Sequence, residues 1–148
     1  MRFSFVSLPV VPAAVVCLTL VAALGGCPMT NIPEPADPNA ISFSRDVQPI
    51  LDARCTSCHQ TNGFADLAGI DLRLTSDVAV AHLLNMRSVE DADQRFVTPG
   101  DPNASLLVTK IESGPQPFGS RMPLFSSRLS DTQIQTIRAW ITQGAQDN

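Results

Sequence analysis

The sequence predicts an all-α fold. Apolar side chains recur at helical spacing in four segments, residues 44–54, 75–86, 102–113 and 131–143. No segment shows the alternation of apolar and polar residues that is typical of a half-buried strand. A length of 148 residues fits one domain. We therefore expect about four helices in a single folded domain that covers residues 43–148.

The residues before this domain have the pattern of an export signal. Arg2 is followed by an apolar run that ends in the small residues of "LGGC", Leu24 to Cys27. This order is typical of a bacterial lipoprotein, in which the signal is removed and the cysteine is acylated. We predict a signal peptide over residues 1–26, acylation of Cys27, and a proline-rich flexible tether over residues 27–42.

Two other interpretations of this segment remain open. A retained membrane anchor is disfavoured because Pro9 and Pro12 interrupt the run, and the stretch from Ala13 to Leu24 is too short to span a bilayer well. The second alternative is an ordinary secretory signal that is cleaved without acylation of Cys27. The favoured interpretation places the protein in the bacterial cell envelope, anchored by lipid and facing the periplasm, on either the inner or the outer membrane.

The charge balance excludes one class of partner. Lys and Arg number 10 against 14 Asp and Glu, a net charge of −4. Removal of residues 1–26 takes away Arg2 and no acidic residue, so the excess of acid grows. Nucleic-acid binding requires a basic surface, so no nucleic-acid partner is expected.

The first predicted helix leads directly into a cysteine motif. Ser44 or Asp46 can cap its start, and Pro49 falls in the first turn, where a missing N–H does little harm. Val47, Ile50 and Leu51 form its apolar stripe.

The middle of the chain is expected to alternate loop and helix. Residues 61–74 are predicted as loop. Thr75 or Ser76 caps the next helix, which ends near Asn85. Asp101 caps the third helix, with Pro102 at its first position and Gly114 after its end.

The last helix has the clearest start signal. Ser130 and Gln133 are spaced as a capping box, and Leu129 can pack against Ile134 as a hydrophobic staple. Gly144 is expected to end it. Its inward face is Ile134, Ile137, Trp140 and Ile141.

The motif "CTSCH", residues 55–59, has three chemical interpretations. A thioredoxin-like dithiol would need a β/α context, which is missing here. A zinc site needs four ligands, but the mature domain offers only Cys55, Cys58, His59 and His82, and adjacent residues 58 and 59 fit one tetrahedral ion poorly. Covalent attachment of a haem uses every feature, because two thiols at this spacing reach its two vinyl groups and the histidine becomes the proximal ligand.

Longer stretches around the motif resemble a known family. "FSRDVQPILDARCTSCH", "VTPGDPNASLLVTKI" and "RMPLFSSRLSDTQIQTIRAWITQGA" are similar to the c-type cytochrome domain of planctomycete and related bacterial proteins, a variant of the class I cytochrome c fold. The resemblance covers about residues 43–145. It implies one covalent haem c, His59 as proximal ligand, a methionine before proline as distal ligand, and packing of helices 44–54 and 131–143 beside the haem.

The distal ligand has several candidates. Met122 precedes Pro123 in the loop before the last helix, which favours it. His82, expected as a partly exposed helix residue, and Met86, expected in the core, remain alternatives, and Met29 lies in the tether. A Met/His pair is a common ligation of haem c.

Several further residues are assigned with alternatives. Arg121 and Arg87 either pair with the haem propionates or lie on the solvated surface. Trp140 is expected in the core. The residues expected in the haem pocket or the core are Phe96, Phe118 and Phe125.

These features favour a mono-haem electron carrier that is not itself an enzyme. It would exchange single electrons with redox partner proteins at the membrane surface. One alternative is a sensor or catalyst for a small gas or peroxide with an open iron site. Another is a haem-bearing accessory subunit of a larger oxidoreductase complex.

Overall fold

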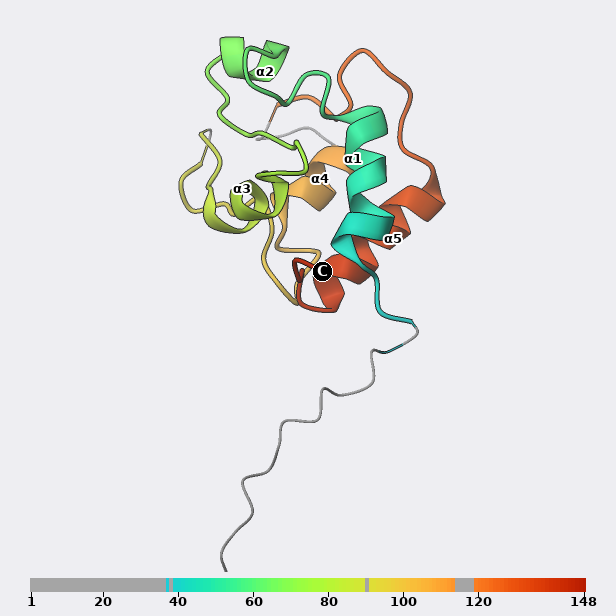
Figure 1. Ribbon diagram of the computed structural model, residues 1–148. Coiled ribbons are helices and arrows are strands. Elements are labelled where there is room, and N and C mark those ends of the chain that lie inside the picture. Colours follow the sequence, from blue (N-terminus) through green and yellow to red (C-terminus); the bar gives the residue numbers. More distant parts are fainter. Residues whose placement is uncertain (1–36, 38, 90, 114–118) are drawn as a thin grey trace, which may run out of the picture. The chain divides into compact units, whose positions relative to one another are not determined.

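The fold is helical throughout the part of the chain that the structure describes. This computed structural model describes residues 37, 39–89, 91–113 and 119–148, which lie within one compact unit. Within these ranges there is no strand, only an isolated bridge between Arg87 and Arg95. The predicted all-α class is confirmed. The elements, shown in Figure 1, are a π-helix Phe43–Val47 (η1), α1 Gln48–Arg54, α2 Phe64–Leu67, α3 Ala79–Asn85, α4 Leu106–Glu112 and α5 Asp131–Thr142.

The first helix begins with a different cap from the one predicted. Ser42, not Ser44 or Asp46, accepts a hydrogen bond from the amide of Arg45 on its side-chain oxygen. Asp46 reaches back and accepts from the amide of Ser42 at 2.9 Å. These two bonds form a reciprocal cap at the start of η1, although Asp46 lies one residue beyond the position that a capping box uses. Pro49 lies in the first turn of α1, as predicted.

The middle helices are shorter than predicted. The expected loop 61–74 contains the single-turn helix α2. The helix expected from residue 75 begins at Ala79, because Thr75 accepts from the amides of Val78 and Ala79 through its carbonyl oxygen in a turn. It ends at Asn85, as predicted.

The third expected helix also starts late. Asp101 caps a turn, accepting from the amides of Asn103 and Ala104, and α4 begins only at Leu106. Ser105 bridges the two, since its buried hydroxyl donates to the carbonyl of Asp101. Gly114, predicted to stop this helix, lies outside the described residues.

The last helix agrees with its prediction. The Ser130 side chain accepts from the Gln133 amide, and the Gln133 side chain accepts from the Ser130 amide, so the capping box is complete. Leu129 and Ile134 are both buried. Gly144 follows the end of α5 with φ +99°, a conformation that favours glycine.

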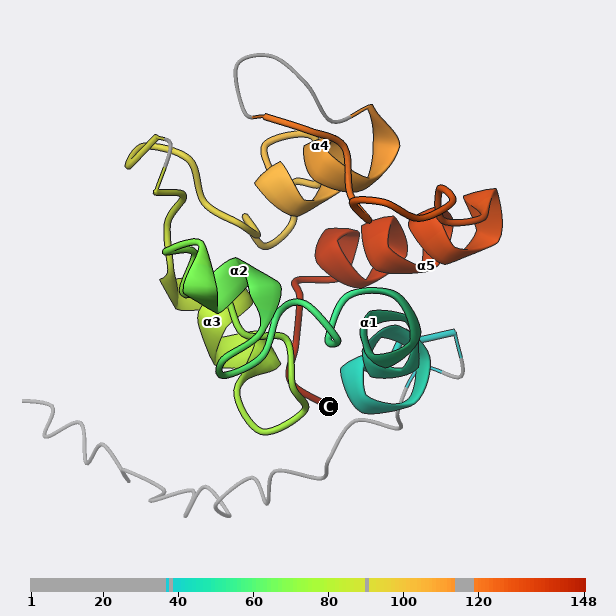
Figure 2. The ribbon, with the colours of Figure 1, turned by 90° about the horizontal axis from the view of Figure 1, so that it is seen from above.

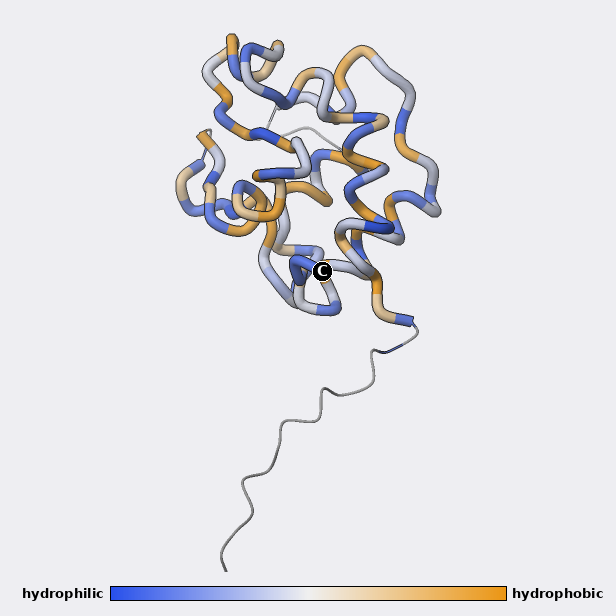
Figure 3. Tube along the Cα trace, viewed as in Figure 1, coloured by the Kyte–Doolittle hydropathy of each residue, from blue (hydrophilic) through white to orange (hydrophobic). Residues whose placement is uncertain are grey.

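The core forms where the first and last helices meet. α5 packs against η1 on one side and α4 on the other (Figures 1 and 2). The rings of Phe43 and Trp140 meet with centroids 5.0 Å apart, and Trp140 is only 1% exposed, so its predicted place in the core is confirmed. Apolar and polar positions are interspersed along the helices in Figure 3, as expected for elements with one buried face.

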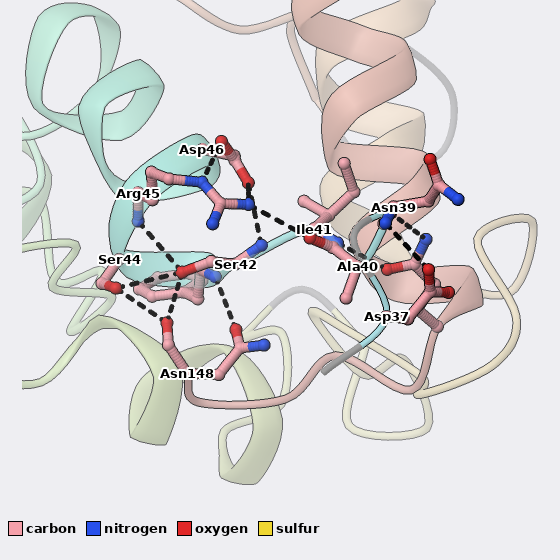
Figure 4. Close-up of polar contacts among 11 residues, drawn as sticks. Asp37, Asn39, Ala40, Ile41, Ser42, Ser44, Arg45, Asp46 and Asn148 are labelled. Atoms are coloured by element: carbon pink, nitrogen blue, oxygen red, sulfur yellow. Dashed lines mark hydrogen bonds and ion pairs between the residues drawn. The ribbon is translucent and has the colours of Figure 1, made fainter. Parts of the chain in front are cut away.

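The start of the first helix is tied to the last residues of the chain (Figure 4). The backbone oxygen of Asn148 accepts from the hydroxyls of Ser42 and Ser44, both at 2.8 Å, and its side-chain oxygen accepts from the amide of Phe43. Ile41 donates to the side chain of Gln143. Ordered contacts therefore begin before Phe43, the predicted start of the domain.

Candidate functional site

The motif 55–59 forms a tight turn at the end of α1. The amides of Cys55 and Thr56 both donate to the carbonyl of Leu51, and the amides of Cys58 and His59 both donate to the carbonyl of Cys55. Backbone hydrogen bonds within this short turn therefore fix the positions of Cys55, Cys58 and His59.

A glycine lets the next segment pack against this turn. A Cβ on Gly63 would overlap the carbonyl oxygen of Cys58, so a larger residue at this position would force the two segments apart. The amide of Ala65 donates to the same Cys58 carbonyl at 3.1 Å. The close approach brings α2 beside the motif.

The motif opens onto a cavity of about 470 Å³. This volume falls within the range of roughly 300–1,000 Å³ that is usual for cofactor and ligand pockets. Its walls are largely apolar and come from α1, α2, α4 and the segments that follow α2, α3 and α4. The apolar lining includes Ala65, Ile70, Leu72, Leu74, Phe96, Leu106, Leu107, Ile111, Pro123 and Leu124.

The two ring nitrogens of His59 have different roles, because only Nδ1 is hydrogen-bonded to the backbone. Its Nδ1 lies 3.0 Å from the carbonyl oxygen of Leu72. A carbonyl only accepts, so Nδ1 carries the proton and Nε2 keeps its lone pair. Burial lowers the pKa of the imidazole, while the Leu72 hydrogen bond works in the opposite direction. The result is a neutral imidazole, the form that binds a metal.

The two cysteines differ from an activated redox pair. Both are free thiols, with Cys55 half-buried and Cys58 exposed. Burial raises the pKa of Cys55 from 9.0 to about 11. Catalytic dithiols depend on a lowered pKa, because the thiolate is the nucleophile. This environment does not favour the dithiol interpretation.

The zinc interpretation also lacks support. Among the described residues, no three side chains of His, Cys, Asp or Glu come together in a group that could hold a metal ion. His82 is half-buried on α3, and its Nδ1 accepts a hydrogen bond from the amide of Arg73. It does not line the cavity that contains His59.

Met122 lines the same cavity as Cys55, Cys58 and His59, although more than 60 residues separate it from them. Its amide donates to the carbonyl of Lys110 at 2.8 Å, which ties it to α4, and the following Pro123 is buried. Met86 instead packs against the core, as predicted, and does not line the cavity. Of the distal candidates within the described residues, the structure brings only Met122 to the cavity.

The charged lining differs from the one proposed from sequence. Arg54 and Lys110 line the cavity, whereas Arg87 and Arg121 do not, and no Asp or Glu of the described residues does. The Arg87 guanidinium donates to the carbonyl of Ala92. Sequence reasoning missed Arg54, although its place directly before Cys55 was a usable signal.

The aromatic residues occupy three different settings. Phe96 is buried and lines the cavity. Phe125 lines its mouth but is 90% exposed, so it is not a core residue; its ring meets that of Phe64 edge to face at 6.4 Å. Phe118 lies outside the described residues.

The predicted signal, Cys27 and Met29 lie outside the described residues. In the part of the chain that the structure covers, no helix has the length and apolar character needed to cross a bilayer.

Comparisons with known proteins give a partial likeness. The chain is 31% identical over 125 residues to hydrazine synthase subunit alpha of Kuenenia stuttgartiensis, a match that covers 72% of this chain and 15% of that subunit. The chain thus spans well under a fifth of the relative's length. No family model and no solved structure matches the chain.

Proposed function

We propose that this protein is a mono-haem c-type cytochrome with a class I cytochrome c-like domain, and that it transfers single electrons. The observation that carries the proposal is the convergence of Cys55, Cys58, His59 and Met122 on one apolar cavity. Two thiols, a neutral imidazole and a thioether are the donor set that a covalently held, six-coordinate haem requires.

Different residues of the chain would bind different parts of the haem. The thiols of Cys55 and Cys58 would each add across a vinyl double bond, so a C–S bond forms, the thiol hydrogen moves to carbon and nothing leaves. His59 Nε2 would be one ligand of the iron, with its ring oriented by the Leu72 carbonyl. The Met122 sulfur would be the second protein ligand. The cationic side chains of Arg54 and Lys110 suit the carboxylates of the propionates.

The chemistry follows from this environment. Bound haem iron supplies one-electron exchange between ferrous and ferric states. A Met122 thioether favours the ferrous state relative to a second imidazole, so the pair His59 and Met122 predicts a higher potential than bis-histidine ligation. The largely apolar lining would limit the contact of water with the iron. With an acylated Cys27, the domain would serve redox partners at the periplasmic surface of a membrane.

The likeness to hydrazine synthase subunit alpha favours a second candidate. A domain that resembles part of an enzyme subunit could act as a haem-bearing accessory component of a larger oxidoreductase. Affinity purification of the tagged protein from its native membranes would distinguish the two. A partner in fixed stoichiometry supports the accessory role, whereas a cytochrome recovered alone supports a freely moving carrier.

Haem attachment is tested by producing the chain with and without haem-maturation machinery. We expect a haem stain that survives denaturation only with the machinery, and its loss in a Cys55→Ser, Cys58→Ser double variant. Ser57→Ala, between the two cysteines, is the matched control and should retain the stain. A wild-type chain that carries no covalent haem would refute the proposal.

A further inference from the structure

Met122 sits on a segment without helical structure. This segment, residues 119–130, leads into α5, and we call it the arch. Pro123 and Leu129 are buried within it, while Phe125 to Arg128 between them are exposed. Phe125 adopts φ +60°, an unusual conformation for a residue with a side chain. Burial therefore holds the arch in place at Pro123 and at Leu129, but not at the exposed residues 125–128 between them.

A single guanidinium ties the middle of the arch to the first helix. A terminal nitrogen of Arg54 donates to the carbonyl oxygen of Ser127 at 2.5 Å and to the Ser127 hydroxyl at 3.0 Å. Among the described residues, no other hydrogen bond joins residues 124–128 to α1. Hydrogen bonds from a charged donor are about twice as strong as neutral ones, and the planar guanidinium fixes their direction.

The position of Arg54 links the two halves of the cavity. It is the last residue of α1 and directly precedes Cys55. Its side chain lines the cavity as well. On the other side, the Met122 amide is bound to the Lys110 carbonyl near the end of α4. The arch is thus held at both ends of the span that carries Met122, by α4 and by the helix that carries the cysteines.

We propose that Arg54 is a positioning residue that holds the arch through Ser127 and so keeps the Met122 sulfur directed into the cavity. This inference rests on the proposed haem ligation by His59 and Met122. Arg54 acts here through Ser127 and Met122, not through direct contact with the iron.

The first test is an Arg54→Ala variant of the haem-loaded protein. We expect covalent haem to remain, while the ferric iron–methionine band weakens and the fraction of ferrous protein that binds carbon monoxide rises roughly tenfold, the effect of one charge-assisted hydrogen bond. Arg54→Lys keeps a charged donor and should partly restore the band. Arg128→Ala, which removes another arginine of the arch and its exposed ion pair with Asp131 of α5, is the matched control and should match wild type.

Hydrogen exchange gives a readout that does not depend on the iron. In Arg54→Ala, the Met122 amide, which donates to the Lys110 carbonyl, should exchange faster, while the amides of α5 should keep wild-type rates. Unchanged exchange in the arch would overturn the inference, as would an unchanged methionine band. If Arg54→Ala does not fold, the same comparison is made with Arg54→Lys, for which a weaker but measurable effect is expected.

A second background separates positioning from direct electrostatics. In a Met122→Ala protein, Arg54→Ala should shift the reduction potential less than it does in the wild-type background, because the ligand that Arg54 positions is gone and only its charge beside the cavity is removed. An equal shift with and without Met122 would show that the charge acts on the haem directly, and would overturn the positioning role. Wild-type protein without a methionine band would instead refute the proposed ligation itself.

Discussion

The hydrogen bond between His59 and Leu72 decides which imidazole nitrogen is available in the cavity. Because the carbonyl can only accept, Nδ1 is protonated and Nε2 keeps its lone pair, which the proposed function assigns to the iron. Backbone support of this kind fixes both the tautomer and the ring orientation of a ligand histidine. At the scale of single residues, the His59 ring therefore already has the tautomer that the proposed ligation requires.

Cys55 and Cys58 should differ in reactivity in the folded chain made without haem. With a pKa raised from 9.0 to about 11, Cys55 favours the protonated thiol, and at pH 8 only about one molecule in a thousand carries the reactive thiolate. We expect iodoacetamide to modify the exposed Cys58 first, as read by peptide mass spectrometry. In urea, where burial is lost, the two should react alike. Equal rates in the folded chain would contradict the burial of Cys55.

Replacement of Met122 should change the iron but not the attachment. Met122→Ala should keep covalent haem, lose the ferric iron–methionine band and lower the reduction potential, because the thioether favours ferrous iron. Met86→Ala is the control, since that side chain packs against the core and should affect stability rather than spectrum. A Met122→Ala protein with an unchanged spectrum would exclude Met122 as a ligand.

At the scale of elements, α5 depends on its capping box. Ser130→Ala removes the acceptor for the Gln133 amide and should lower the free energy of unfolding by about 1 kcal/mol. The measurement is urea denaturation, compared with Ser76→Ala, an exposed serine outside any helix. If the two variants unfold at the same urea concentration, the cap contributes nothing to stability.

The elements also show which sequence signals suffice. α5 has a reciprocal cap, buried residues at both staple positions and a glycine after its end, and its start was predicted correctly from local sequence. For α3 and α4, Thr75 and Asp101 are good cap residues, but their backbone or side-chain oxygens close turns several residues before the helix. Local sequence cannot distinguish a helix N-cap from a turn that precedes the helix, because in both cases the residue's oxygen accepts from backbone amides two to four positions later.

The candidate site was predictable in part for a similar reason. The spacing of Cys55, Cys58 and His59 is a local signal, and a methionine followed by proline singled out Met122. The cavity wall was not predictable, because Arg54, Phe64 and Lys110 are far apart in the sequence and come to line one cavity only through tertiary packing. The contact between Arg54 and Ser127 spans 73 positions and has no periodic pattern.

At the scale of the whole molecule, the cavity is a basic site in an acidic protein. Among the described residues its lining contains the cations Arg54 and Lys110 but no carboxylate, although the chain carries a net charge of −4. This distribution suits a group that brings its own carboxylates. It also leaves the remaining surface acidic, which favours partners with a basic docking face.

Attachment of the protein to a membrane should depend on the sulfur of Cys27. Cys27→Ala removes the sulfur that would carry lipid, so we expect the protein to move from the membrane to the soluble fraction of the envelope. Immunoblots of fractionated cells measure this, with Cys17→Ala, inside the predicted signal, as the control. Retention of Cys27→Ala on membranes would show that lipid at this residue is not the anchor.

The measurement to make first is an optical spectrum, ferric and ferrous, of the protein produced with haem-maturation machinery. It tests the cofactor and both ligands together. We predict a low-spin c-type spectrum with the weak long-wavelength band of a ferric iron–methionine bond. A high-spin spectrum that shifts when carbon monoxide is added would mean an open iron site and contradict ligation by Met122. Absence of covalent haem would contradict the cytochrome assignment as a whole.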